Sequence, residues 1–268
     1  MTARVPTDEQ IAQHHQHVIA EHAERQPLVG PWQDLAQLTN EYQGSEAYRR
    51  QIHSLQTQYR ALRRCRGDGN CFFRAFAFAW YEAIFRDRAK VDQALQTLAQ
   101  SAILLEAAGF EPLAYEDFLE TCTETLTTLS QQVQEGLGTQ DAQTLLEQLL
   151  DSTEVSNAMV VYLRFITSAY LRQHQDEYLP FLEEATDMAT FCARYVEAMG
   201  CESDQIHIIA LTRALGVGLR VAYLDGSQTH DAATIHPFPS ADEWATGAQF
   251  ASLHLLYRPG HYDILYRQ

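Results

Sequence analysis

The sequence predicts an α+β protein that is mostly helical, with a small antiparallel sheet near the C-terminus packed against a buried central helix. Three observations support this fold class. An apolar stretch of helical length covers residues 71–85 and carries only two charged residues, Arg74 and Glu82. Between residues 31 and 215, most apolar residues recur at steps of three and four. From Gly218 onward they alternate with polar residues, a pattern typical of strands.

The N-terminal part of the chain is expected to be helical. Residues 1–26 are polar and histidine-rich, and they predict a weakly amphipathic helical arm. Pro31 predicts the start of a short helix. A second helix is predicted over residues 46–63, because an apolar stripe with helical spacing runs through Tyr48, Ile52, Leu55, Tyr59 and Leu62.

The middle of the chain is expected to contain several more helices and one surface loop. Helices are predicted over residues 91–105, within 112–136, after the N-caps Thr139 and Thr153, over 186–199, and over 205–215 after the cap Asp204. The polar stretch 174–184 contains Pro180 and is interpreted as a loop.

Strands are predicted in the C-terminal part, over residues 219–223, 234–236, 252–257 and 261–266. The dipeptide Pro259-Gly260 favours a tight turn, since proline suits its first central position and glycine the positive φ of its second. The last two strands are therefore predicted to form a β-hairpin.

Cys71 follows the turn sequence Asp68-Gly69-Asn70 and begins the apolar helix. A thiol at a helix N-terminus lies near free backbone N–H groups and the positive end of the helix dipole, and both favour the nucleophilic thiolate. The alternative is a buried, unreactive cysteine, which is the more common role for a cysteine considered alone. A general base elsewhere in the chain would decide between the two.

His261 opens the last predicted strand and is a candidate for that base. Residues i and i+2 of a strand point to the same face, so His261 and Asp263 are expected to lie side by side. A carboxylate beside an imidazole fixes the orientation of the ring, as a cysteine nucleophile requires of its base. For a single histidine, the alternative is a strand-end residue that makes one hydrogen bond.

Taken together, these segments resemble the otubain family of the ovarian-tumour class of cysteine deubiquitinases. The resemblance rests on four motifs in the family's order, and it extends from about residue 27 to the C-terminus. The motifs are Asp68-Gly69-Asn70-Cys71-Phe72 followed by Arg74-Ala75-Phe76, Tyr162-Leu163-Arg164 with Thr167-Ser168, Glu202-Ser203-Asp204-Gln205-Ile206-His207-Ile208, and Tyr257-Arg258-Pro259-Gly260-His261-Tyr262-Asp263-Ile264-Leu265-Tyr266.

The resemblance implies the papain-like fold of the ovarian-tumour (OTU) proteases and a role for each matched residue. Cys71 would be the nucleophile, His261 the general base and Asp263 its orienting carboxylate. Asp68, Gly69 and Asn70 would form the loop whose backbone amides make the oxyanion hole, with Asp68 also counted among the catalytic residues. One departure is visible, because Gly67 stands where otubains usually carry proline.

The resemblance also suggests where ubiquitin binds. Tyr178, Glu202, Asp204 and His207 lie in or next to family-like segments that carry no catalytic chemistry, so they are expected to form the ubiquitin-binding face. The arm 1–26 corresponds to an N-terminal segment that helps otubains to hold ubiquitin and, in some members, to block ubiquitin-conjugating enzymes.

Length and composition agree with a single catalytic domain over residues 27–268. The chain has 268 residues, of which 46% are hydrophobic, so it can bury a sizeable core. The predicted nucleophile and base lie near opposite ends of this region and must meet in one site. The net charge of -16 disfavours a nucleic-acid partner, which needs a basic surface, and suits either a basic partner or simple solubility.

The cysteine pattern and the lack of a long apolar segment argue against three further classes of protein: disulfide-stabilised, zinc-binding and membrane-associated. The five cysteines are odd in number and form no C-x-x-C pair, which disfavours a disulfide framework and a zinc site. Neither a signal-peptide core nor an apolar run of membrane-spanning length is present, so no membrane association is expected. The expected location is the cytoplasm, with the nucleus as an alternative, and the expected chemistry uses no metal or cofactor.

The sequence thus predicts a cysteine deubiquitinase that hydrolyses isopeptide bonds between ubiquitin and lysine, with polyubiquitin of the proteasome-targeting linkage as substrate. Two alternatives stay open. One is a binding protein that restrains ubiquitin-conjugating enzymes without using its active site. The other is an isopeptidase for a related modifier or a general papain-like peptidase.

Overall fold

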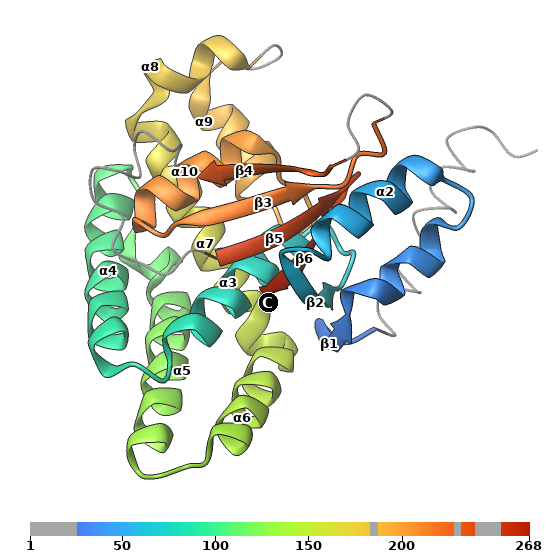
Figure 1. The fold of residues 1–268 in the computed structure, drawn as a ribbon. Coiled ribbons are helices and arrows are strands. Elements are labelled where there is room, and N and C mark those ends of the chain that lie inside the picture. The colour runs from blue at the N-terminus through green and yellow to red at the C-terminus, as the bar shows by residue number, and fades with distance from the viewer. Residues whose placement is uncertain (1–25, 183–186, 228–231, 239–252) are drawn as a thin grey trace, which may run out of the picture.

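The computed structural model describes residues 26–182, 187–227, 232–238 and 253–268, and its centre is a six-stranded sheet with helices on both faces (Figure 1). The strands are β1 (Val29–Asp34), β2 (Tyr59–Cys65), β3 (Leu219–Tyr223), β4 (Thr234–Phe238), β5 (Leu253–Arg258) and β6 (His261–Arg267). Their order across the sheet is β1-β2-β6-β5-β3-β4. The predicted arm, residues 1–26, lies outside the described residues except for its last one.

The helices account for most of the remaining chain. They are η1 (Leu35–Tyr42), α2 (Glu46–Leu55), α3 (Cys71–Ile84), α4 (Arg88–Ala107), η2 (Pro112–Ala114), α5 (Glu116–Gln134), α6 (Thr139–Asp151), α7 (Thr153–Gln173), α8 (Gln175–Tyr178), η3 (Leu179–Phe181), α9 (Met188–Phe191), η4 (Cys192–Val196) and α10 (Gln205–Leu215). The α+β fold class, mostly helical, is confirmed.

Helix α3 is the buried central helix that the sequence predicts. Every residue of α3 except Glu82 and Ala83 is buried. The helix contacts β5 and β6 of the sheet as well as α4, α6 and α7. The opposite face of the sheet is covered by η1 and α2, which pack on Leu62, Leu256 and Leu265. The N-terminal end of α3 is therefore held in place by the main core.

The sheet is larger and less regular than predicted. Its strands β3 and β5 are parallel, whereas the other neighbouring pairs are antiparallel. Two strands, β1 and β2, come from the N-terminal part of the chain. The predicted hairpin is confirmed, since β5 and β6 pair through the turn at Pro259-Gly260, where Gly260 has a φ of +73°. The prediction of a purely antiparallel, C-terminal sheet was wrong.

The predicted helix over residues 46–63 was also wrong in its second half. Helix α2 ends at Leu55, and β2 pairs with β1 and β6. Leu62 packs under α2 while Cys65 belongs to the main core, so β2 is buried on both faces. A strand of this kind does not alternate apolar and polar residues, and its spacing is easily read as helical.

Other boundaries differ for local reasons. Pro31 lies within the edge strand β1, where a missing N–H costs no ladder bond, and the helix after it begins at Leu35 behind the cap Asp34. The caps of α6 and α7 are one residue earlier than predicted. The expected loop 174–184 contains the short helices α8 and η3, while the helix predicted over 186–199 is divided into α9 and the π-helical turn η4.

Candidate active site

Cys71 is the first residue of α3 and lines a cavity. Its side chain is 5% exposed, and the turn at residues 68–70 directs the chain into the helix. The cavity has a volume of about 420 Å³. Its other lining residues are Glu202, Ser203, Asp204, Gln205, Tyr223, Tyr257, Gly260 and Tyr262. The structure thus places the predicted nucleophile in a pocket that is also lined by acidic and aromatic side chains.

His261 and Asp263 lie side by side on β6, as the strand periodicity predicts. His261 Nε2 donates a hydrogen bond to Asp263 Oδ1 at 2.9 Å. Burial lowers the pKa of the His261 imidazole, but hydrogen bonds to Asp263 and Cys71 outweigh this effect and raise the pKa to about 9. Because Nε2 is bound to Asp263, Nδ1 is the nitrogen left for Cys71. At neutral pH the imidazolium therefore lies beside the Cys71 sulfur.

Asp263 is fully buried and nevertheless ionised. Burial raises the pKa of its carboxyl group, but the hydrogen bond from His261, the charge of Arg258 and the amide of Cys65 together bring the pKa below its usual value. Arg258 donates to Asp263 Oδ2 from Nε at 3.1 Å and from Nη2 at 2.7 Å. The Cys65 amide donates to Oδ1 at 3.0 Å. These bonds fix the carboxylate that orients His261.

Arg258 is a site residue to which the sequence reasoning assigned no role. It lies opposite His261 in the β5–β6 hairpin. The sequence contained a signal, since Arg258 directly precedes the Pro259-Gly260 turn. A charged residue at the end of a mostly buried strand needs a partner of opposite charge, and in a hairpin such a partner lies across the turn.

The oxyanion loop, residues 68–70, is closed by the side chain of Asp68. Asp68 Oδ1 accepts from the Asn70 amide at 2.9 Å, and Oδ2 pairs with the buried Arg74 at 2.6 Å. Arg74 also donates to Ser156 at 2.6 Å. Asp68 therefore organises the loop rather than presenting its carboxylate to the cavity.

Two backbone donors of this loop are left for a ligand. The Asp68 amide donates to the Arg66 carbonyl at 3.0 Å and the Asn70 amide donates to Asp68, so both are occupied. Within the part of the chain that the structure describes, the amides of Gly69 and Cys71 have no acceptor. These two amides are the candidates for the oxyanion hole.

The four residues predicted to bind ubiquitin divide into two pairs. Glu202 and Asp204 are exposed and line the cavity beside Cys71. Tyr178 and His207 are 6% and 2% exposed, so any contribution they make to binding is indirect. His207 completes a capping box with Asp204 at the start of α10. Burial raises the pKa of Asp204, but hydrogen bonds from His207 and the helix amides lower it overall.

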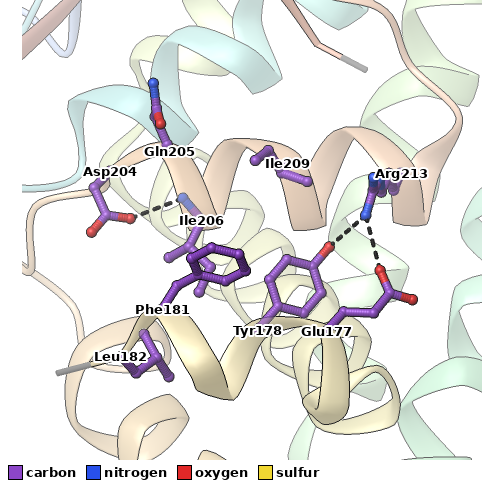
Figure 2. Close-up of a pocket in the computed structure, with 9 residues that line it drawn as sticks. All are labelled: Glu177, Tyr178, Phe181, Leu182, Asp204, Gln205, Ile206, Ile209 and Arg213. Atoms are coloured by element: carbon purple, nitrogen blue, oxygen red, sulfur yellow. Dashed lines mark hydrogen bonds and ion pairs between the residues drawn. The ribbon is translucent and has the colours of Figure 1, made fainter. Parts of the chain in front are cut away.

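A second hollow adjoins the surface that carries Asp204, between α8, η3 and α10 (Figure 2). It has a volume of about 640 Å³ and shares Asp204 and Gln205 with the cavity at Cys71. Phe181 lies over it with 79% of its surface exposed. On the far side Arg213 donates to Tyr178 at 3.1 Å, as the dashed line in Figure 2 marks. An apolar hollow with charged edges thus continues the surface that leads to the nucleophile.

The described residues contain no metal-binding group, in that no three of their His, Cys, Asp or Glu side chains are arranged to hold an ion. The predicted histidine-rich arm lies outside this search. All five cysteines are free thiols. In the same described ranges, no helix is both long and apolar enough to cross a membrane.

Comparison with known proteins gives consistent matches over nearly the whole chain. The family model described as Peptidase C65 Otubain matches residues 21–267. "OVARIAN TUMOR DOMAIN-containing deubiquitinating enzyme 1" of Arabidopsis thaliana is 38% identical over 260 residues, covering 92% of this chain and 83% of that protein. "Ubiquitin thioesterase OTUB1" of Homo sapiens is 36% identical over 264 residues, covering 97% and 90%.

A solved structure is similar in fold along the same length. "The structure of h/ceOTUB1-ubiquitin aldehyde-UBCH5B~Ub" matches with a TM-score of 0.82 and 30% identity, and the match covers 97% of this chain and 98% of that one. The resemblance inferred from the sequence motifs is therefore confirmed.

Proposed function

Because this chain belongs to the otubain family of cysteine peptidases, we propose that it is a deubiquitinase that hydrolyses isopeptide bonds between ubiquitin and lysine side chains. We propose further that its substrate is polyubiquitin of the proteasome-targeting linkage, through lysine forty-eight of ubiquitin. The observation that carries the activity is the contact of His261 with both Cys71 and Asp263. The linkage preference rests on the resemblance to otubains.

The first half of the reaction releases the lysine. The Cys71 thiolate attacks the carbonyl carbon of the isopeptide bond, and the electron pair of the carbonyl moves onto oxygen. The amides of Gly69 and Cys71 stabilise this oxyanion. When the intermediate collapses, the C–N bond breaks and the His261 imidazolium gives its proton to the leaving amine. Ubiquitin stays attached to Cys71 as a thioester.

The second half releases ubiquitin. The now neutral His261 accepts a proton from a water molecule, which attacks the thioester carbonyl at the same oxyanion site. The C–S bond breaks, which restores the Cys71 thiolate beside the His261 imidazolium, and the ubiquitin tail leaves as a carboxylic acid that gives its remaining proton to the solvent. Asp263 stabilises the imidazolium throughout.

The acidic wall of the cavity supports ubiquitin as the substrate. Ubiquitin has an arginine-containing C-terminal tail, and that tail must enter the cavity to reach Cys71. Glu202 and Asp204 are the exposed carboxylates that line the way. The Glu202 carboxylate lies against the hairpin turn next to His261, because a Cβ built on Gly260 would be 3.5 Å from Glu202 Oε1. Opposite charges at this entrance favour encounter and alignment of the tail.

The proposed activity is tested with ubiquitin that carries a thiol-reactive group at its C-terminus. The native chain should form a covalent adduct, Cys71→Ala should form none, and His261→Ala should react far more slowly. A panel of di-ubiquitin linkages then tests the linkage preference. Absence of an adduct from the native chain, or equal reaction with a related modifier, would contradict the proposal.

Restraint of ubiquitin-conjugating enzymes is the second candidate function, because the matched solved complex contains UBCH5B~Ub together with OTUB1. The two functions separate on two variants. Cys71→Ala should abolish hydrolysis and leave restraint intact, and deletion of residues 1–26 should abolish restraint and leave hydrolysis. We also propose a cytoplasmic or nuclear location, supported by five free thiols, which suit a reducing compartment.

A further inference from the structure

A fully buried arginine lies beneath the oxyanion loop and has no part in the mechanism described above. Arg164 belongs to the middle of α7 and is 0% exposed. Its guanidinium carbon is 4.6 Å from the ring centre of Phe73, two residues after the nucleophile on α3. Burying an arginine side chain is costly unless its donors are satisfied, so the partners of Arg164 indicate what it does.

The donors of Arg164 serve two segments of the chain, the oxyanion loop and the segment from Val196 to Cys201. Nη2 donates to the Gly69 carbonyl at 3.0 Å, to Asn70 Oδ1 at 2.9 Å and to the Cys201 carbonyl at 2.8 Å. Nη1 donates to the Val196 carbonyl at 2.9 Å. Since Nη2 carries only two protons, at least one of them is shared between acceptors. The guanidinium thus holds both the oxyanion loop and the segment after η4.

These two segments also touch each other directly. Asn70 Oδ1 accepts a hydrogen bond from the Gly200 amide at 2.9 Å. A Cβ on Gly69 would lie 2.0 Å from the Gly200 carbonyl oxygen, so the backbones pack at the closest distance that glycine permits. The 200–204 loop, which starts at this contact, supplies Glu202, Ser203 and Asp204 to the cavity wall.

The positive charge of Arg164 faces these oxygens and the ring of Phe73. Burial lowers its pKa to about 10, which still leaves it cationic at neutral pH. No carboxylate among the described residues forms an ion pair with Arg164, unlike the buried Arg74, which pairs with Asp68. Three backbone carbonyl groups and the side-chain oxygen of Asn70 take the place of a counter-ion.

We propose that Arg164 is a positioning residue for hydrolysis, which clamps the oxyanion loop to the 200–204 loop and so sets where the Gly69 and Cys71 amides stand relative to the bound ubiquitin tail. The inference rests on the proposed hydrolase activity. It deepens that activity by naming the contact between the loop that stabilises the oxyanion and the loop that lines the substrate cavity.

A clamp of this kind has a distinct kinetic signature. The oxyanion exists in the intermediate and not in the bound substrate, so a misplaced amide lowers kcat more than it raises KM. Misplacement by about 1 Å can reduce the rate by about 10²-fold. The thiolate itself depends on His261 and the helix end, so its reaction with a small alkylating agent should not need the clamp.

The test compares Arg164→Lys with Arg172→Lys. Lysine keeps the charge but lacks the planar fork, so it cannot reach all four acceptors together. Arg172 is a matched control on the same helix, because it also lies over an aromatic ring, that of Phe110 at 4.9 Å, and forms an ion pair with Glu197 at 2.5 Å. It makes no contact with residues 68–70.

Three readouts are measured on the folded fraction of each variant. They are kcat and KM with a fluorogenic ubiquitin amide, the affinity for ubiquitin aldehyde, and the rate at which iodoacetamide alkylates Cys71. For Arg164→Lys we expect kcat and aldehyde affinity to fall by about 10²-fold, with KM and the alkylation rate within about twofold. Arg172→Lys should leave all three near the native values.

A second variant keeps the test decisive if Arg164→Lys folds poorly. Asn70→Ala removes the oxygen that Arg164 and Gly200 share, and it should lower kcat with the same pattern but to a smaller extent. Native kcat in both variants, or a fall in alkylation that matches the fall in kcat, would overturn the proposal. If the native chain itself does not hydrolyse the fluorogenic amide, that result contradicts the proposed function and not the proposed role of Arg164.

Discussion

The two walls of the active-site cavity are built differently. On the catalytic wall, which the residues around Cys71 form, each of these side chains is at most 24% exposed and has a fixed partner: His261 binds Asp263, Asp263 binds Arg258, and Asp68 binds Arg74. On the substrate wall, Glu202 and Asp204 are exposed. We infer from this difference that the folded core positions the catalytic groups, while the proposed recognition of ubiquitin depends on exposed charges. Variants on the first wall should change kcat, and variants on the second should change KM.

The largest effect is expected for Asp263→Asn. The amide cannot stabilise the imidazolium as a carboxylate does, and kcat should fall by about 10³- to 10⁴-fold, as for other triad carboxylates. KM should change little, because Asp263 lies behind His261 and away from the substrate wall. Steady-state kinetics with a fluorogenic ubiquitin amide measures both constants, and a rise in KM with native kcat would contradict this assignment.

The same variant tests the pKa of His261. In the native chain the imidazolium persists up to a pH of about 9, so kcat/KM should fall as the pH rises through that value, because neutral His261 cannot protonate the leaving amine. Asp263→Asn removes the negative charge that helps to raise this pKa. In this variant the fall of kcat/KM at high pH should therefore move to lower pH. A fall at the same pH as in the native chain would mean that another group titrates there.

Arg258→Met should lower the stability of the fold more than it changes KM. The change removes one of the two cations that bind the buried Asp263 carboxylate, which should lower the free energy of unfolding by about 3 kcal/mol. Urea unfolding measures this loss. Arg64→Met is the control, since its ion pair with Glu41 is partly exposed and should be worth less than about 1 kcal/mol. Equal losses of unfolding free energy in the two variants would show that the buried ion pair contributes no more to stability than the exposed one.

Glu202→Lys should change recognition alone. Reversal of one exposed charge at the cavity should raise KM by about tenfold and leave kcat within about twofold, and added salt should reduce the difference. Glu111→Lys changes the net charge equally at an exposed residue outside the cavity, so its KM should stay native. A similar rise in both variants would show that only the overall charge matters.

The smallest effect is expected for Gly67→Pro. A Cβ on Gly67 would be 3.6 Å from His261 Nδ1, an ordinary contact, and the Gly67 amide donates to no acceptor among the described residues. Proline should therefore raise the free energy of unfolding by about 0.5 kcal/mol through the unfolded state. We expect kcat to change by at most about threefold. A tenfold loss would show that glycine is needed for the motion of His261.

The sequence predicted those parts of the site that depend on local signals. The start of α3 at Cys71, the β5–β6 hairpin and the Asp204 cap of α10 each follow from a few neighbouring residues, and all three are present. The resemblance to otubains added the oxyanion loop. Glu202 and Asp204 are exposed, and their place on a binding face stays a prediction.

The remaining features depend on contacts between distant segments. Strand β2 pairs with β6 about two hundred residues later, as Arg63 and Ile264 show, and no local pattern reveals such a pairing. The role of Arg164 likewise depends on Asn70, 94 residues away, and on Cys201, 37 residues away. The motif around Arg164 was recognised, but which atoms its guanidinium meets is decided only by the packing of α7 against α3.

The division between the two walls is tested most directly by measuring kcat and KM of Asp263→Asn, Glu202→Lys and their double variant on one fluorogenic ubiquitin amide. We expect the first change to act on kcat, the second on KM, and the two free-energy changes to add in the double variant, since the residues share no partner. If Glu202→Lys lowers kcat as strongly as Asp263→Asn, or if the effects do not add, the two walls do not act separately and the account is contradicted.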